Sequence, residues 1–163
     1  MKYLPLGIIL VLFLLKDNAS SQTEAYPFTV EQKKAVDSLL ADSVNSRLAL
    51  TSDCDISFFK EFHKQNPDYT PYFIVSDLDG DGLKDFVIAL KHGKDYTVFL
   101  FRATKDGYRK PLFVCKIDWL NQCGFIAGNG LLQIEQFPRL GYGPILKWNK
   151  QYEDLEPINM EAK

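Results

Sequence analysis

The chain has 163 residues, of which 46% are hydrophobic and 25% are charged, and its formal net charge is −2 at pH 7. This balance is typical of a globular protein, and the length suits one domain with a single hydrophobic core. The near-neutral charge without a basic cluster argues against a nucleic-acid-binding protein, and no basic amphipathic segment indicates a membrane-surface protein.

Residues 1–21 are predicted to be a secretory signal peptide. An apolar stretch from Leu4 to Leu15 follows Lys2, and the small residues Ala19 and Ser21 fit a cleavage site. The stretch is too short to span a bilayer, which needs about 20 apolar residues. We therefore expect a secreted or periplasmic product with no membrane span, in which residues 22–28 are a linker and residues 29–163 form one globular domain.

Two helices are predicted near the start of this domain. Thr29 and Gln32 match a capping box, and apolar residues then recur at helical spacing, which predicts a helix from about Val30 to Leu48. A second helix is predicted from Ser57 to Gln65, where Asn66-Pro67 ends the helical pattern.

An acidic run of nine residues, from Asp77 to Asp85, contains four carboxylates. Their mutual repulsion disfavours a compact loop, whereas a hard divalent cation that prefers oxygen ligands would stabilise it. Asp77, Asp79 and Asp81 occupy positions 1, 3 and 5 of a calcium loop, and Gly82 occupies position 6, where a sharp turn excludes a side chain.

The remaining oxygens of such a loop would come from its second half. Leu83 at position 7 offers its backbone carbonyl, and Asp85 at position 9 binds directly or through a water, which gives roughly six to eight ligands with solvent. The alternative is that Asp79-Gly80 and Asp81-Gly82 are only turn dipeptides of a hairpin, but one Asp-Gly would suffice for that. We expect a Ca²⁺ site formed by Asp77, Asp79, Asp81, Leu83 and Asp85.

Short apolar runs, 72–75 and 86–90, flank the loop and predict strands rather than the helices of an EF-hand. Ile88 also stands at position 12, where an EF-hand needs a bidentate Glu. The run 77–88 resembles the Asp-x-Asp-Gly-Asp-Gly-x-x-Asp-hydrophobic signature of FG-GAP and VCBS-type repeats in integrin-like and bacterial surface proteins. The resemblance covers one loop copy and implies a calcium site between two strands, and a propeller of several blades is excluded.

The rest of the chain favours a β-rich core, in keeping with its 13% aromatic content. Residues 124–130 are expected to be a flexible glycine-rich connection. Hairpin turns are predicted at Lys105–Tyr108 and at Asn149-Lys150. The predicted strands are Tyr72–Ser76, Phe86–Lys91, Tyr96–Arg102, Leu112–Ile117, Leu131–Gln136, Pro144–Trp148 and Tyr152–Leu155. The fold class is α+β, with one or two N-terminal helices packed on an antiparallel β-meander that resembles a single propeller blade.

Three cysteines, Cys54, Cys115 and Cys123, suggest one structural disulfide and one remaining thiol in an oxidising compartment. Cys115 with Cys123 is the pairing closest in sequence, and Cys54 with Cys123 is nearly as plausible. The spacings do not supply the two close ligand pairs of a zinc site.

The sequence favours a secreted, non-enzymatic calcium-binding domain in which the ion is chiefly structural. An alternative is an envelope-associated recognition or inhibitor module for a glycan or protein, with the loop 137–144, which carries Arg139 among aromatic residues, as its contact. A small secreted hydrolase ranks last, because His63 and His92 lack a recognisable nucleophile motif and no Gly-x-Ser-x-Gly is present.

Overall fold

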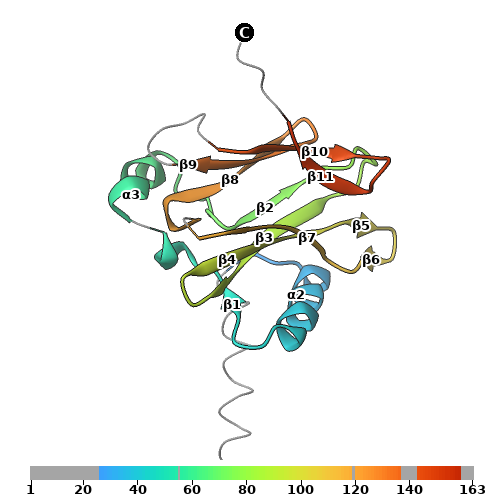
Figure 1. The fold of residues 1–163 in the computed structure, drawn as a ribbon, viewed down its shortest axis with the longest axis horizontal. Coiled ribbons are helices and arrows are strands. Elements are labelled where there is room, and N and C mark those ends of the chain that lie inside the picture. Colours follow the sequence, from blue (N-terminus) through green and yellow to red (C-terminus); the bar gives the residue numbers. More distant parts are fainter. Residues whose placement is uncertain (1–25, 55, 119, 137–142, 159–163) are drawn as a thin grey trace, which may run out of the picture.

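A computed structural model describes residues 26–54, 56–118, 120–136 and 143–158 of the chain (Figure 1). The described helices are α2 (Val30–Asp42) and α3 (Ile56–Gln65), and every strand pairing is antiparallel. The predicted α+β class with an antiparallel meander is therefore confirmed.

The strands form two sheets and one small hairpin. In the first sheet, β3 pairs with β4 on one edge and with β1 and β2 on the other, and β4 pairs with β7. The second sheet is a meander in the order β11-β10-β9-β8, and β5 pairs with β6. The strands are β1 (Arg47–Leu48), β2 (Phe73–Ser76), β3 (Asp85–His92), β4 (Asp95–Phe101), β5 (Ala103–Thr104), β6 (Gly107–Tyr108), β7 (Leu112–Ile117), β8 (Cys123–Gly128), β9 (Leu131–Gln136), β10 (Ile145–Asn149) and β11 (Asp154–Pro157).

Strand β3 is the centre of the fold, since six consecutive residues from Asp85 to Leu90 are buried. Successive side chains of a strand point to opposite faces, so burial of the whole run requires cover on both sides. On one face Phe86 stacks on Phe101 of β4, with ring centroids 4.3 Å apart, and Phe28 packs nearby. In Figure 1 the first sheet lies between α2 and the second sheet.

The start of α2 is as predicted, and its end is not. The Thr29 backbone N–H donates to Gln32 Oε1 at 2.9 Å and the Gln32 N–H donates to Thr29 Oγ1 at 3.2 Å, which is a capping box. The prediction that the helix continues to Leu48 is wrong, because the chain turns at Asn45, with φ of 60°, and enters β1. Leu48 then pairs opposite Leu90 and is fully buried, so pairing with β3 replaces the last helical turns.

The prediction of a flexible connection at 124–130 is also wrong. Strand β8 takes up most of it and pairs with β9 along its whole length, with Phe125 fully buried. Asn129 and Gly130, with φ of 54° and 72°, form the two-residue turn between these strands. The Asn129-Gly130 dipeptide is a sequence signal for such a hairpin that the prediction missed. The Phe125 N–H also donates to the Pro71 carbonyl at 2.8 Å, which joins the second sheet to the approach to β2.

The other predicted elements lie within one to three residues of their predicted bounds. Strands β7 and β9 match the predictions, and α3 begins one residue before its predicted start. The final hairpin is shifted, with β10 at Ile145–Asn149 and β11 at Asp154–Pro157, and its turn ends at Glu153, with φ of 52°.

The described part of the chain begins at Tyr26, within the segment predicted as a linker. The Tyr26 hydroxyl donates to the Ala49 carbonyl and its ring lies 5.6 Å from that of Phe73, so this end packs against the core. The predicted signal peptide lies outside the described residues. Within them, no helix has the length and apolar character needed to cross a membrane.

No disulfide joins Cys54 to Cys115. Burial raises the pKa of the Cys115 thiol to about 11, which is typical of an inert thiol. The side chain of Cys123 and residues 137–142 of the predicted contact loop lie outside the described residues, so the two pairings with Cys123 and the contact loop stay predictions.

Candidate metal centre

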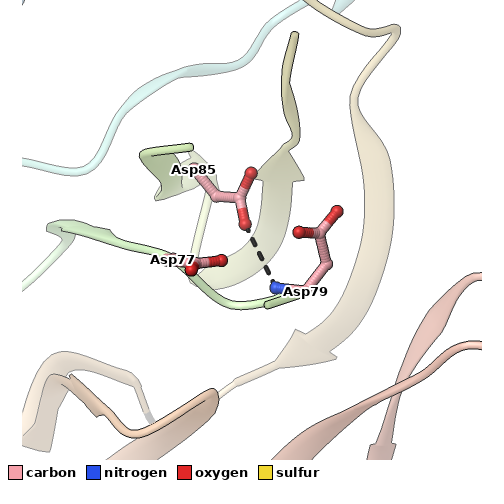
Figure 2. A group of neighbouring side chains, drawn as sticks. All are labelled: Asp77, Asp79 and Asp85. Atoms are coloured by element: carbon pink, nitrogen blue, oxygen red, sulfur yellow. Dashed lines mark hydrogen bonds between the residues drawn. The ribbon is translucent and has the colours of Figure 1, made fainter. Parts of the chain in front are cut away.

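The acidic loop joins β2 to β3, as the strand-loop-strand prediction requires. The two strands pair antiparallel, and Ser76 lies opposite Asp85 at the base of the loop. Three of its carboxylates come together, because one oxygen from each of Asp77, Asp79 and Asp85 lies within 4.8 Å of the others (Figure 2).

Asp77 shapes the first turn of the loop. Its Oδ1 accepts a hydrogen bond from the Gly80 N–H at 2.8 Å, and its Oδ2 accepts one from the Gly82 N–H at 3.0 Å. Gly80 and Gly82 have φ of 76° and 88°, a left-handed conformation that side chains disfavour. The glycines therefore let the backbone curl around one carboxylate, as an Asx turn does.

Asp85 is the buried anchor of the loop, with no exposed surface. Its Oδ2 accepts from the Leu78 N–H at 2.9 Å and the Asp79 N–H at 3.4 Å, and its Oδ1 accepts from the Ala103 N–H at 2.8 Å. Burial raises the pKa of Asp85, and the charge of Asp79 raises it further, while the hydrogen bonds from Ala103 and Leu78 oppose the shift. One carboxylate thus holds the loop against β5.

Asp79 forms an ion pair that the sequence did not predict. Both Nε and Nη2 of Arg102 lie 2.8 Å from Asp79 Oδ2, and Asp79 Oδ1 accepts from the Asp81 N–H at 3.1 Å. Arg102 directly follows β4, and its guanidinium carbon lies 4.3 Å from the ring centroid of Trp148 in β10. No local spacing connects these three residues. The pairing of β3 with β4 brings Arg102 to the loop, and the packing of the two sheets brings Trp148 to Arg102.

Asp81 and Leu83 are placed differently from the other three predicted ligands. Asp81 is exposed and does not belong to the group of three carboxylates, and its Oδ1 accepts from the Leu83 N–H at 2.8 Å. This bond keeps the second half of the loop compact. Coordination by Asp81 and by the Leu83 carbonyl stays a prediction.

The donor chemistry fits a hard cation. Asp77, Asp79 and Asp85 supply only carboxylate oxygens, which Ca²⁺ prefers, and offer no nitrogen or sulfur ligand. A carboxylate has about four lone-pair sites, and the hydrogen bonds described above leave each of the three with acceptor capacity. The loop contains four acidic residues and one basic residue, Lys84, and Arg102 compensates one further charge, so the loop stays electronegative.

A hollow of about 620 Å³ lies between α2 and the strands β4 and β6, away from the acidic group. Phe99 and Phe101 contribute to its apolar wall, and Arg109 and Lys110 contribute cationic groups. Phe113 pairs with Phe99 at a centroid distance of 6.4 Å and is 57% exposed, which adds apolar surface beside the hollow. The volume is within the range of about 300–1,000 Å³ of small-molecule sites.

Comparisons with known proteins do not identify a family for this chain. No protein-family model matches the chain, and no curated protein or solved structure matches it significantly.

Proposed function

We propose that this protein is a secreted, non-enzymatic domain whose loop 77–85 binds Ca²⁺ and that the ion is chiefly structural. The observation that carries the proposal is the convergence of Asp77, Asp79 and Asp85, which come from positions 1, 3 and 9 of the motif, to within 4.8 Å of one another. Secretion rests on the predicted signal peptide.

The loop's position explains why the ion would be structural. The loop links two strands of the first sheet, and Asp85 and Asp79 connect it to Ala103 and Arg102 just beyond β4. A bound cation would offset the repulsion between the carboxylates at this junction. Extracellular calcium modules have dissociation constants of about 0.1–1 mM. At free calcium ten times that constant, binding adds about 1.4 kcal/mol to the free energy of unfolding.

Asp77→Asn is expected to abolish most of the calcium-dependent rise in melting temperature, which is about 4 °C for the unmodified protein at such a calcium concentration. Within the described part of the chain, the hydrogen bonds to Asp77 come from backbone N–H groups of its own loop, so its replacement removes a ligand charge without breaking an ion pair. Differential scanning calorimetry with calcium, with magnesium and with a chelator measures the effect.

Asp106→Asn is the matched control, because Asp106 is an exposed acid on the neighbouring β5–β6 turn. It should retain the full rise. An equal rise in wild type and Asp77→Asn would rule out this loop as the calcium site. Asp79 is a poorer choice for the first test, since its replacement also removes the closer of the two carboxylates that face Arg102.

A second candidate function is recognition of a cell-envelope glycan or protein, which the hollow beside Phe99 and the exposed Phe113 favour. Phe113→Ser should then weaken binding to a panel of envelope glycans at least tenfold, while Val75→Ser, which alters an exposed residue of β2, should not. Binding measured on immobilised glycans with and without a chelator tests this. Equal binding by both variants would argue against the surface around Phe113.

A further inference from the structure

Arg102 connects the acidic loop to the C-terminal hairpin formed by β10 and β11. On one side it makes the two 2.8 Å contacts with Asp79 Oδ2, and on the other its guanidinium lies over Trp148. Its Nη1 also lies 3.7 Å from Glu153 Oε1, at the turn of the hairpin. The side chain of Arg102 is 13% exposed and that of Asp79 is 2% exposed, so their pairing is shielded from solvent.

The second sheet approaches the loop at another point as well. Gly130, in the β8–β9 turn, has φ of 72°, and a Cβ built on it would lie 3.8 Å from the Leu78 carbonyl oxygen. Leu78 belongs to the loop and is buried in the core. The loop therefore contacts the second sheet at two places, the β8–β9 turn and the β10–β11 hairpin. The contact with the hairpin is made through the charged side chain of Arg102.

Arg102 has two carboxylates within reach, and they differ in exposure. It holds the buried Asp79 at 2.8 Å, whereas Glu153 is 3.7 Å away and its side chain is 67% exposed. Arg109 also lies 4.0 Å from Glu153. A second positive charge placed in the loop would repel Arg102 and compete with it for Asp79, and Glu153 is the acceptor to which the guanidinium can turn.

We infer that Arg102 is the resident counter-cation of the loop and that cation binding shifts its ion pair from Asp79 toward Glu153, which couples the loop to the β10–β11 hairpin. The inference rests on the proposed calcium function. It assigns to Arg102 two effects: a lower calcium affinity than the bare loop would have, and a change around Trp148 when the loop is occupied. By thermodynamic linkage, whatever weakens the Arg102–Asp79 pair strengthens cation binding.

The test follows Trp148 fluorescence and calorimetric heat during calcium titration of the full chain. Trp119, the only other tryptophan, is replaced by Phe so that Trp148 alone reports. In this background the fluorescence midpoint should coincide with the calorimetric midpoint. Arg102→Met, which keeps an apolar stem, should bind calcium at least about tenfold more tightly and lose the Trp148 response.

Two further variants make the result specific. Arg109→Met removes the other arginine near Glu153, does not contact Asp79 and should leave the midpoint within twofold. Glu153→Gln removes the second acceptor and should weaken calcium binding about threefold, and it tests the exchange even if Arg102→Met folds poorly.

The outcomes separate this inference from the proposed function. Calcium binding by wild type with an unchanged or weaker affinity in Arg102→Met would overturn the counter-cation role and leave the calcium site standing. An unchanged affinity in Glu153→Gln would overturn the exchange. No calcium heat in any variant at millimolar concentration would overturn the proposed function and this inference with it.

Discussion

Asp53→Ala is expected to lower the free energy of unfolding by about 3 kcal/mol. The side chain of Asp53 is 8% exposed and accepts hydrogen bonds from both Nη atoms of Arg47, each at 2.6 Å, and from Lys91 Nζ at 2.8 Å. The Leu50 N–H donates to it at 2.8 Å as well. Alanine would leave this N–H without its acceptor and two cations side by side, because Arg47 and Lys91 are direct partners in the β1–β3 pairing.

Asp53 is also expected to make the stability of the protein depend on pH. Burial opposes ionisation of Asp53, but the hydrogen bonds from Arg47, Leu50 and Lys91 outweigh it and hold its pKa well below the usual value. A carboxyl with a lowered folded-state pKa stabilises the protein above the unfolded pKa of about 4, and this contribution is lost as the pH falls toward the folded pKa. The difference between wild type and Asp53→Ala should therefore shrink below about pH 4.

Urea unfolding at a series of pH values, with calcium chelated, measures both effects. Glu61→Ala is the control, because Glu61 forms an exposed pair with Lys64, its one ion pair among the described residues, and should change stability by less than about 0.5 kcal/mol. A loss of the same small size in Asp53→Ala would show that this cluster does not stabilise the β1–β3 junction.

The sequence predicts the elements of this fold well where the signal is local. The Thr29–Gln32 capping box and the strands β7 and β9 depend on residues a few positions apart, and they are found as predicted. The error at the end of α2 lies where a distant partner decides. Leu48 has the spacing of a helical residue, but the edge of β3 offers its backbone partners and a buried position.

The candidate metal centre shows the same limit. The motif spacing identified Asp77, Asp79 and Asp85, and the loop conformation brings them together because its glycines and N–H groups are local. Arg102 was predicted only as the end of a strand, yet it forms an ion pair with Asp79, 23 residues away, and stacks on Trp148. The first contact exists because β4 pairs with β3 beside the loop, and the second because the two sheets pack against each other, and no single spacing encodes either.

Asp85→Asn is expected to lower the free energy of unfolding by about 2–3 kcal/mol even when calcium is absent. Both carboxylate oxygens accept backbone hydrogen bonds, from Ala103 on one and from Leu78 and Asp79 on the other. Asparagine supplies one oxygen and one amide group that only donates, so in either orientation at least one N–H faces another donor. Because Asp85 has no exposed surface, water would have to enter the core to replace the lost acceptor.

The loss without calcium isolates the hydrogen-bonding role of Asp85 from its proposed role as a ligand. In chelator, Asp77→Asn should cost less than Asp85→Asn, because Asp77 is only partly buried and solvent can reach the N–H groups of Gly80 and Gly82, both of which are exposed. Urea unfolding gives the stabilities, and amide hydrogen exchange at Ala103 should accelerate only in Asp85→Asn. If the two variants are equally stable without calcium, the buried hydrogen bonds of Asp85 do not hold the loop against β5. If they differ as expected, the loop is folded before any ion binds, and the ion adds stability to a site that the backbone has already formed.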